Sequence, residues 1–169
     1  MIRGRYVIGL TGSIGMGKSF ASSLIRRAGV PVFDADAEVH VLMGKGGRAV
    51  KAVEAAFPGV VIDCAVDRPS LGAQVFGDAG ALKRLERILH PMVGQSERAF
   101  MSRAARNRHR IVARDVPLLF ETGGDKRCDL TIVVSAPAHI QRYRVLARPG
   151  MTEERLAQVR GKQMPDAQK

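Results

Sequence analysis

The sequence predicts an α/β protein with a parallel sheet, and two observations support this prediction. Residues 6–11 are apolar and partly β-branched, which is typical of a buried strand, and a helical pattern follows over 18–28. Further along the chain, stretches with strand character alternate with longer helical stretches. We therefore expect strands that run in the same direction, connected by helices.

A glycine-rich turn joins the first strand to the first helix. Residues 12–19 fit G-x-x-x-x-G-K-[ST], the pattern of a phosphate-binding loop. Glycines allow the backbone to wrap closely around a polyphosphate, and the loop N–H groups form an anion site with the helix N-terminus. Lys18 supplies a positive charge for the phosphates, and Ser19 a hydroxyl for Mg²⁺. The succession of strand, glycine-rich loop and helix predicts a P-loop NTPase fold with three layers, α/β/α.

The remaining elements of the predicted core follow from apolar periodicity. The helix over 18–28 places Ala21, Leu24, Ile25 and Ala28 on one face, and Gly29 is its expected C-cap. Further strands are expected over 30–33, 110–115 and 130–135, and helices over 138–148 and after a Thr152 cap.

The stretch between the second and third strands is too long for one crossover. We expect helical structure over 37–57, interrupted at 44–47, and a helix over 79–89 that is capped by Asp78. His90-Pro91 is expected to break that helix before a second one runs to about residue 107. Residues 58–77 are mixed in character. We interpret the block 37–108 as a helical insertion.

Carboxylates stand at the expected ends of two strands. Asp34 and Asp36 follow the second strand and Asp115 ends the third, where an open α/β sheet presents its ligand crevice. Asp34 or Asp36 could instead cap the following helix. We favour a functional role for Asp34 and leave both readings open for Asp36. Asp115 stands where P-loop enzymes place an acid that holds Mg²⁺.

Charge and composition restrict the class of ligand. Lys and Arg total 27 against 16 acids, a formal charge of +11, so polyanions are favoured. Aromatic residues are 5% without tryptophan, so we expect no nucleic-acid partner. No apolar run is long enough for a membrane span, and no signal peptide precedes the first strand, so we expect a cytoplasmic protein.

Several motifs together resemble the dephospho-coenzyme A kinase family of the P-loop kinase superfamily. They are Gly9–Ser19, Asp34-Ala35-Asp36, Asp67-Arg68, Leu89-His90-Pro91, the run 115–121, and Gln141 with Arg144, Arg148 and Gln163. The resemblance extends from Tyr6 to Lys169. Family chains continue through a last strand and an adenine-side loop, so we expect this chain to be incomplete at its C-terminus.

The resemblance implies transfer of the ATP γ-phosphoryl group to the ribose 3′-hydroxyl of dephospho-CoA, giving CoA and ADP. It implies a single domain over 1–169, with a core over about 1–36 and 109–137. The insertion over about 37–108 would bind the acceptor, and residues 138–165 would form a helical lid. We expect a monomer with two small-molecule substrates, ATP and dephospho-CoA, and no membrane partner.

The resemblance also assigns roles to individual residues. Catalytic roles fall to Asp34, Lys18 and Arg144. ATP contacts fall to Gly12, Gly15, Met16, Gly17, Lys18, Ser19, Phe20, Arg144 and Arg148. Acceptor contacts fall to Asp36, Arg68 and His90, and Mg²⁺ contacts to Ser19 and Asp115. From the residues alone, Arg68 could equally form a surface ion pair, and His90 could interact with a helix-end dipole.

Two other functions fit parts of the pattern. Another small P-loop kinase, with a nucleotide or shikimate-like acceptor, would share the loop and sheet. A GTPase-like switch would need an Asn-Lys-x-Asp motif, and the sequence contains none.

Overall fold

The computed structural model describes residues 4–161 and 163–169 of the chain, which form two compact units. One unit comprises residues up to Asp34 together with Arg103–Lys169, and the other comprises Ala35–Ser102. We call them the sheet unit and the helical unit. The sequence predicts a helical insertion over about 37–108. The helical unit begins and ends somewhat earlier than this interval.

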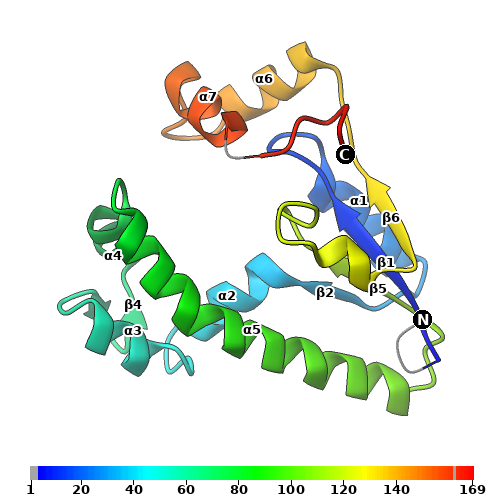
Figure 1. Cartoon of the computed structure of the whole chain (residues 1–169), viewed down its shortest axis with the longest axis horizontal. Coiled ribbons are helices and arrows are strands. Elements are labelled where there is room, and N and C mark those ends of the chain that lie inside the picture. Colours follow the sequence, from blue (N-terminus) through cyan, green and yellow to red (C-terminus); the bar gives the residue numbers. More distant parts are fainter. Residues whose placement is uncertain (1–3, 162) are drawn as a thin grey trace. The chain divides into compact units, whose positions relative to one another are not determined.

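A four-stranded parallel sheet forms the centre of the sheet unit, which confirms the predicted α/β class (Figure 1). Its order is β2-β5-β1-β6, with bounds Val32–Asp34, Ile111–Asp115, Tyr6–Thr11 and Leu130–Val133. Val7, Leu10 and Val112 are fully buried, as expected for inner strands covered on both faces. In this sheet β1 lies directly between β5 and β6.

Helices complete the sheet unit. They are α1 (Lys18–Arg27), α6 (Ala138–Leu146) and α7 (Glu153–Gly161), with a short 3₁₀ helix over Gly124–Arg127. The expected inner face of α1 is partly wrong, because Leu24 is 46% exposed whereas Ser22 is buried. The Ser22 hydroxyl accepts a hydrogen bond from Arg26 at 2.8 Å, which satisfies the buried oxygen.

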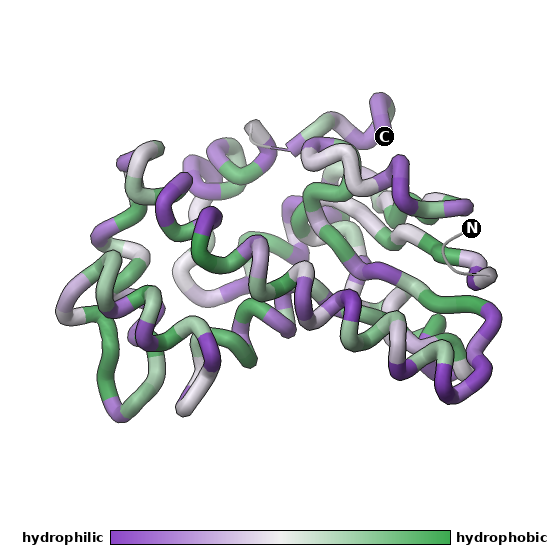
Figure 2. Tube along the Cα trace, turned by 60° about the horizontal axis from the view of Figure 1, so that its bottom comes forward, coloured by the Kyte–Doolittle hydropathy of each residue, from purple (hydrophilic) through white to green (hydrophobic). Residues whose placement is uncertain are grey.

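The helical unit contains four helices and a small hairpin. The helices are α2 (Ala35–Met43), α3 (Val50–Ala56), α4 (Arg68–Val75) and most of α5 (Ala79–Arg106), and the hairpin strands are β3 (Val61–Ile62) and β4 (Ala65–Val66). Its core includes Leu42, Val53, Phe57, Leu85 and Leu89. In Figure 2 the turns of α5 alternate between hydrophobic and hydrophilic residues, as expected for a helix with one buried face.

Residues 58–77 had no assigned elements, and the structure shows why their pattern is weak. The two hairpin strands have only two residues each, too short for a visible alternation. Asp63 and Cys64 at the turn both have positive φ, the geometry of a type I′ turn, but the pair lacks the usual glycine signal. Asp67 then caps α4 by accepting a hydrogen bond from the Ser70 N–H.

The expected break at His90-Pro91 is wrong, because α5 is one continuous helix with Pro91 inside it. Proline leaves the carbonyl four residues earlier without its helical donor and usually ends or kinks a helix. Here an apolar stripe continues on both sides of the proline, through Leu85 and Leu89 to Met92 and Val93, and packs on the core of the helical unit. This packing outweighs the local cost of the proline.

We therefore predict that Pro91→Ala raises the free energy of unfolding, because it restores the missing backbone donor. The gain should be positive and at most about 3 kcal/mol, the usual penalty for a proline inside a helix. Urea unfolding of the variant and of Lys83→Ala, an exposed position on the same helix, would measure it. A lower or unchanged midpoint for Pro91→Ala would show that the helix has adapted to its proline.

Candidate active site

The loop between β1 and α1 has the backbone shape of an anion site. Gly15 and Gly17 have φ values of 77° and 98°, and Gly17 is the N-cap of α1, so Lys18 begins the helix. Among the described residues, the backbone N–H groups of Gly15, Gly17, Lys18 and Ser19 donate no hydrogen bond. These donors therefore remain available to a phosphate group at a helix N-terminus.

Neighbouring elements approach the loop closely. A Cβ placed on Gly12 would lie 2.6 Å from the carbonyl oxygen of Val134, just beyond β6. A Cβ placed on Gly15 would lie 2.5 Å from Cγ2 of Val145 on α6. Both contacts are too short for a side chain, so glycine is required at these two positions for packing, and at Gly15 also for its positive φ.

Lys18 and Asp115 meet at the end of the sheet. The Lys18 Nζ lies 2.5 Å from Oδ1 of Asp115, whose side chain is almost fully buried. Asp115 also pairs in register with Leu10 on β1 and with Asp34 on β2. The two strand-ending carboxylates predicted from sequence are thus neighbours across the sheet, on the edge from which the phosphate-binding loop begins.

Asp34 is the last residue of β2, and α2 begins immediately after it. Its side chain is 29% exposed and lies 3.7 Å from the Arg26 guanidinium on α1. A partly exposed carboxylate at this edge remains accessible to a substrate hydroxyl. Asp36 lies within the first turn of α2 and is therefore not its N-cap, although its charge favours the helix dipole there.

Of the motif residues Gln141, Arg144 and Arg148, only Gln141 is buried. Arg144 is exposed, and a Cβ placed on Gly17 would lie 3.4 Å from its Nη1, so this arginine reaches the phosphate-binding loop. Arg148 lies beyond the end of α6 and is exposed. Gln141 is only 3% exposed, because its amide points into the loop instead of the solvent.

Three loop residues assigned to ATP differ in their surroundings. Ser19 and Phe20 are exposed at the start of α1, with the Phe20 side chain 67% exposed. Met16 is buried, and its Sδ accepts a hydrogen bond from the Ala136 N–H at 3.2 Å. The Met16 side chain therefore supports the loop from behind, and any contact it makes with ATP would come from its backbone.

Arg68 and His90 both belong to the helical unit. Arg68 Nη1 lies 3.3 Å from Nδ1 of His40. His90 is exposed in the interior of α5, so the alternative of a helix-end dipole contact is wrong. Next to Arg68, hydrogen bonds from the Ser70 hydroxyl and backbone N–H hold the pKa of Asp67 below its usual value, so this helix cap stays ionised.

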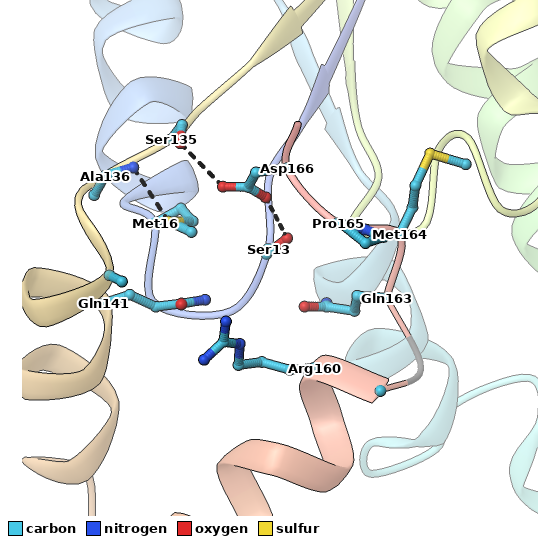
Figure 3. Close-up of a pocket in the computed structure, with 12 residues that line it drawn as sticks. Ser13, Met16, Ser135, Ala136, Gln141, Arg160, Gln163, Met164, Pro165 and Asp166 are labelled. Carbon is cyan, nitrogen blue, oxygen red and sulfur yellow. Dashed lines mark hydrogen bonds between the residues drawn. The ribbon is translucent and has the colours of Figure 1, made fainter. Parts of the chain in front are cut away.

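The residues that hold the phosphate-binding loop were not predicted from sequence. Ile14 donates its N–H to Oε1 of Gln163 at 3.0 Å, and its carbonyl accepts from Nε2 of Gln141 at 2.8 Å. Asp166 accepts hydrogen bonds from the hydroxyls of Ser13, at 2.6 Å, and Ser135, at 3.0 Å (Figure 3). The place of Gln141 and Gln163 among the motif residues of the resemblance is the one sequence signal that could have indicated such contacts.

The side chains that contact the loop, those of Gln141, Gln163 and Asp166, line a cavity of about 500 Å³ beside it (Figure 3). The chain segment that closes it, residues 163–166, is anchored by Glu121, which accepts the Met164 N–H at 2.7 Å. Partial burial opposes ionisation of Glu121, but hydrogen bonds from the Met164 and Glu121 backbone and the Lys169 ammonium hold its pKa below its usual value. The anchor is therefore ionised at neutral pH.

The oxygen groups at the site fit a magnesium ion better than a metal held by protein alone. Within residues 4–161 and 163–169, no three His, Cys, Asp or Glu side chains gather into a metal cluster. One carboxylate, Asp115, and one hydroxyl, Ser19, match the sparse protein ligation of Mg²⁺ in kinases, where phosphate oxygens complete the shell.

In the described part of the chain, no helix combines the length and apolar character needed to cross a membrane.

Comparison with known proteins gives a consistent result. The family model for dephospho-CoA kinase matches residues 6–169. The chain is 66% identical over 163 residues to a dephospho-CoA kinase of Paramagnetospirillum magneticum, covering 96% of this chain and 77% of the relative. It is 56% identical over 163 residues to one of Mesorhizobium japonicum, covering 96% and 82% of the two chains.

Solved structures agree with the fold. A crystal structure from Thermus thermophilus superposes with a TM-score of 0.83 at 34% identity, covering 98% of this chain and 84% of that one. A dephospho-CoA kinase from Campylobacter jejuni shares the fold at a TM-score of 0.59 and 20% identity, covering 94% and 80%. With an open phosphate-binding loop and a family match over nearly its whole length, the chain belongs to the dephospho-CoA kinase family, enzymes that phosphorylate dephospho-CoA with ATP in coenzyme A biosynthesis.

Proposed function

We propose that this chain transfers the γ-phosphoryl group of ATP to the ribose 3′-hydroxyl of dephospho-CoA, with Mg²⁺ as the metal. The observation that carries the proposal is the loop with four available N–H donors beside the Lys18–Asp115 ion pair. Family membership favours dephospho-CoA over the nucleotide or shikimate-like acceptors that the loop alone would allow. Phosphoryl transfer needs mainly positioning and charge neutralisation, which these groups supply.

On the donor side, the loop N–H groups and Lys18 would bind the β- and γ-phosphates. Lys18 now contacts Asp115, so ATP would draw the ammonium toward the γ-phosphate and leave the Asp115 carboxylate to the metal side. Ser19 and Asp115 would hold Mg²⁺, which neutralises charge on the transferred group. The exposed Arg144 and Arg148 would add positive charge from the α6–α7 segment, the expected lid.

On the acceptor side, we assign Asp34 as the group that orients the 3′-hydroxyl and takes its proton. Its register next to Asp115 supports this role, because the two carboxylates then flank one reaction centre. Asp36, Arg68 and His90 would contact dephospho-CoA, and all three side chains are exposed. We also propose that the protein acts as a monomer and in the cytoplasm.

The reaction is tested with ATP, Mg²⁺ and a panel of acceptors. We expect ADP only with dephospho-CoA, and Lys18→Ala should nearly abolish it, because the lysine charge faces the γ-phosphate. Because the variant leaves the buried Asp115 carboxylate without its ion-pair partner, its folding is checked by circular dichroism before activities are compared. Turnover with a nucleoside or shikimate but not with dephospho-CoA, or full activity of the lysine variant, would contradict the proposal.

We predict that Asp34→Asn lowers turnover roughly 10²- to 10⁴-fold, the usual contribution of a general base, with little change in ATP binding. Asp115→Asn should instead raise the Mg²⁺ concentration needed for half-maximal rate. The matched control is Arg26→Gln, which breaks the ion pair of Asp34 but keeps its carboxylate. Equal losses in Arg26→Gln and Asp34→Asn would assign Asp34 a structural role.

We also predict that Arg144→Ala reduces turnover at saturating ATP, because it removes a charge at the phosphate-binding loop. Arg142 is the control on the same helix, since it forms an ion pair with Glu153 on α7. Arg142→Ala should lower the unfolding midpoint at most and leave turnover unchanged. If both variants behaved alike in stopped-flow assays, Arg144 would be only a structural residue.

A further inference from the structure

Ile14, at the turn of the phosphate-binding loop, is held through both of its backbone polar groups. Its N–H donates to the Oε1 of Gln163 at 3.0 Å, and its carbonyl oxygen accepts from the Nε2 of Gln141 at 2.8 Å. Figure 3 shows the two amides extending toward the loop from opposite sides. A backbone N–H can only donate and a carbonyl can only accept, so the orientation of both amides follows from the contacts.

The two glutamines flank one helical segment. Gln141 lies in α6, near its N-terminal end, and Gln163 follows the last residue of α7 by two positions. Between them lie Arg144, which reaches the loop, and the rest of α6 and α7. Both ends of the α6–α7 segment therefore contact the same residue of the phosphate-binding loop.

Such an external support has a physical reason. A loop that keeps the N–H groups of Gly15, Gly17, Lys18 and Ser19 available for phosphate cannot use them to stabilise its own shape, which leaves the bond from the Met16 N–H to the Ser13 carbonyl as its internal turn contact. Without the glutamines, the peptide groups on either side of Ile14 would lose the partners that fix their planes, and the neighbouring Gly15 and Gly17 adopt many other conformations at little cost. The hydrogen bond from Gln141 is partly buried, so without it the Ile14 carbonyl would be left without this donor in a partly buried position.

We propose that Gln141 and Gln163 are positioning residues that hold the phosphate-binding loop in its anion-binding shape and make that shape depend on the placement of the α6–α7 segment. The inference rests on the proposed role of the loop in binding ATP. Under this proposal, the two side chains affect ATP affinity selectively although they do not contact the phosphates directly. Binding of dephospho-CoA should be unaffected.

One substitution at two positions provides the test, because the two amides work in opposite directions. Gln163→Glu keeps an acceptor for the Ile14 N–H, whereas Gln141→Glu replaces a donor with a carboxylate that faces a carbonyl oxygen. We expect Gln141→Glu to raise the KM for ATP roughly tenfold or more, and Gln163→Glu to change it by about twofold at most. Gln163→Leu, which has no acceptor, should resemble Gln141→Glu.

Gln74 is the matched control, because its Nε2 also donates to a backbone carbonyl, that of Pro58, in the helical unit. Gln74→Glu should leave the KM for ATP unchanged. The KM for dephospho-CoA and the unfolding midpoint are measured for every variant, and ATP titration by calorimetry replaces the KM wherever turnover is too low. If the two Gln→Glu variants had the same KM for ATP, or Gln163→Leu were unaffected, the proposal would be wrong.

Lys18→Ala distinguishes this failure from failure of the proposed function. If Lys18→Ala lost activity while the two Gln→Glu variants had equal KM values for ATP, the ATP site would be supported and the positioning role rejected. Normal ATP affinity and turnover in Lys18→Ala would reject the ATP site itself, and the positioning role with it.

Discussion

The phosphate-binding loop has to keep the N–H groups of Gly15, Gly17, Lys18 and Ser19 unused, and the sheet unit is arranged around this constraint. The N–H groups that would stabilise an ordinary turn are available at Gly15, Gly17 and the start of α1. The loop is therefore supported from outside, by close packing on α6 and on the end of β6, and by side-chain hydrogen bonds to Ser13 and Ile14. The result is a rigid site for a flexible, highly charged ligand, because little of the loop remains to be ordered when the ligand binds.

The parallel sheet supplies the charges that this loop needs. Parallel strands end at the same edge, so β2 and β5 place Asp34 and Asp115 side by side where β1 turns into the loop. Lys18 bridges the loop and the sheet through Asp115, an almost fully buried carboxylate. A buried ion pair costs more in lost hydration than a surface pair, which favours a functional role for these two residues.

The helical unit illustrates how packing overrides local preference. Pro91 should end a helix, yet α5 continues through it because apolar side chains on both sides of the proline pack on one core. The same helix carries His90 in its interior, exposed, next to the residue that removes a backbone donor. The carbonyl of Arg87 thereby lacks its usual helical donor, which makes this turn of α5 locally different from the rest.

Sequence alone determined the α/β class, the phosphate-binding loop, the Asp78 and Thr152 caps and the carboxylates at the strand ends, because each follows from local spacing or periodicity. It did not determine the order β2-β5-β1-β6, the continuity of α5, or the inner face of α1. These depend on which surfaces pack together. The contacts of Gln141, Gln163 and Asp166 with the loop were decided by tertiary structure alone, because residues more than 120 positions apart in the chain leave no periodic signal.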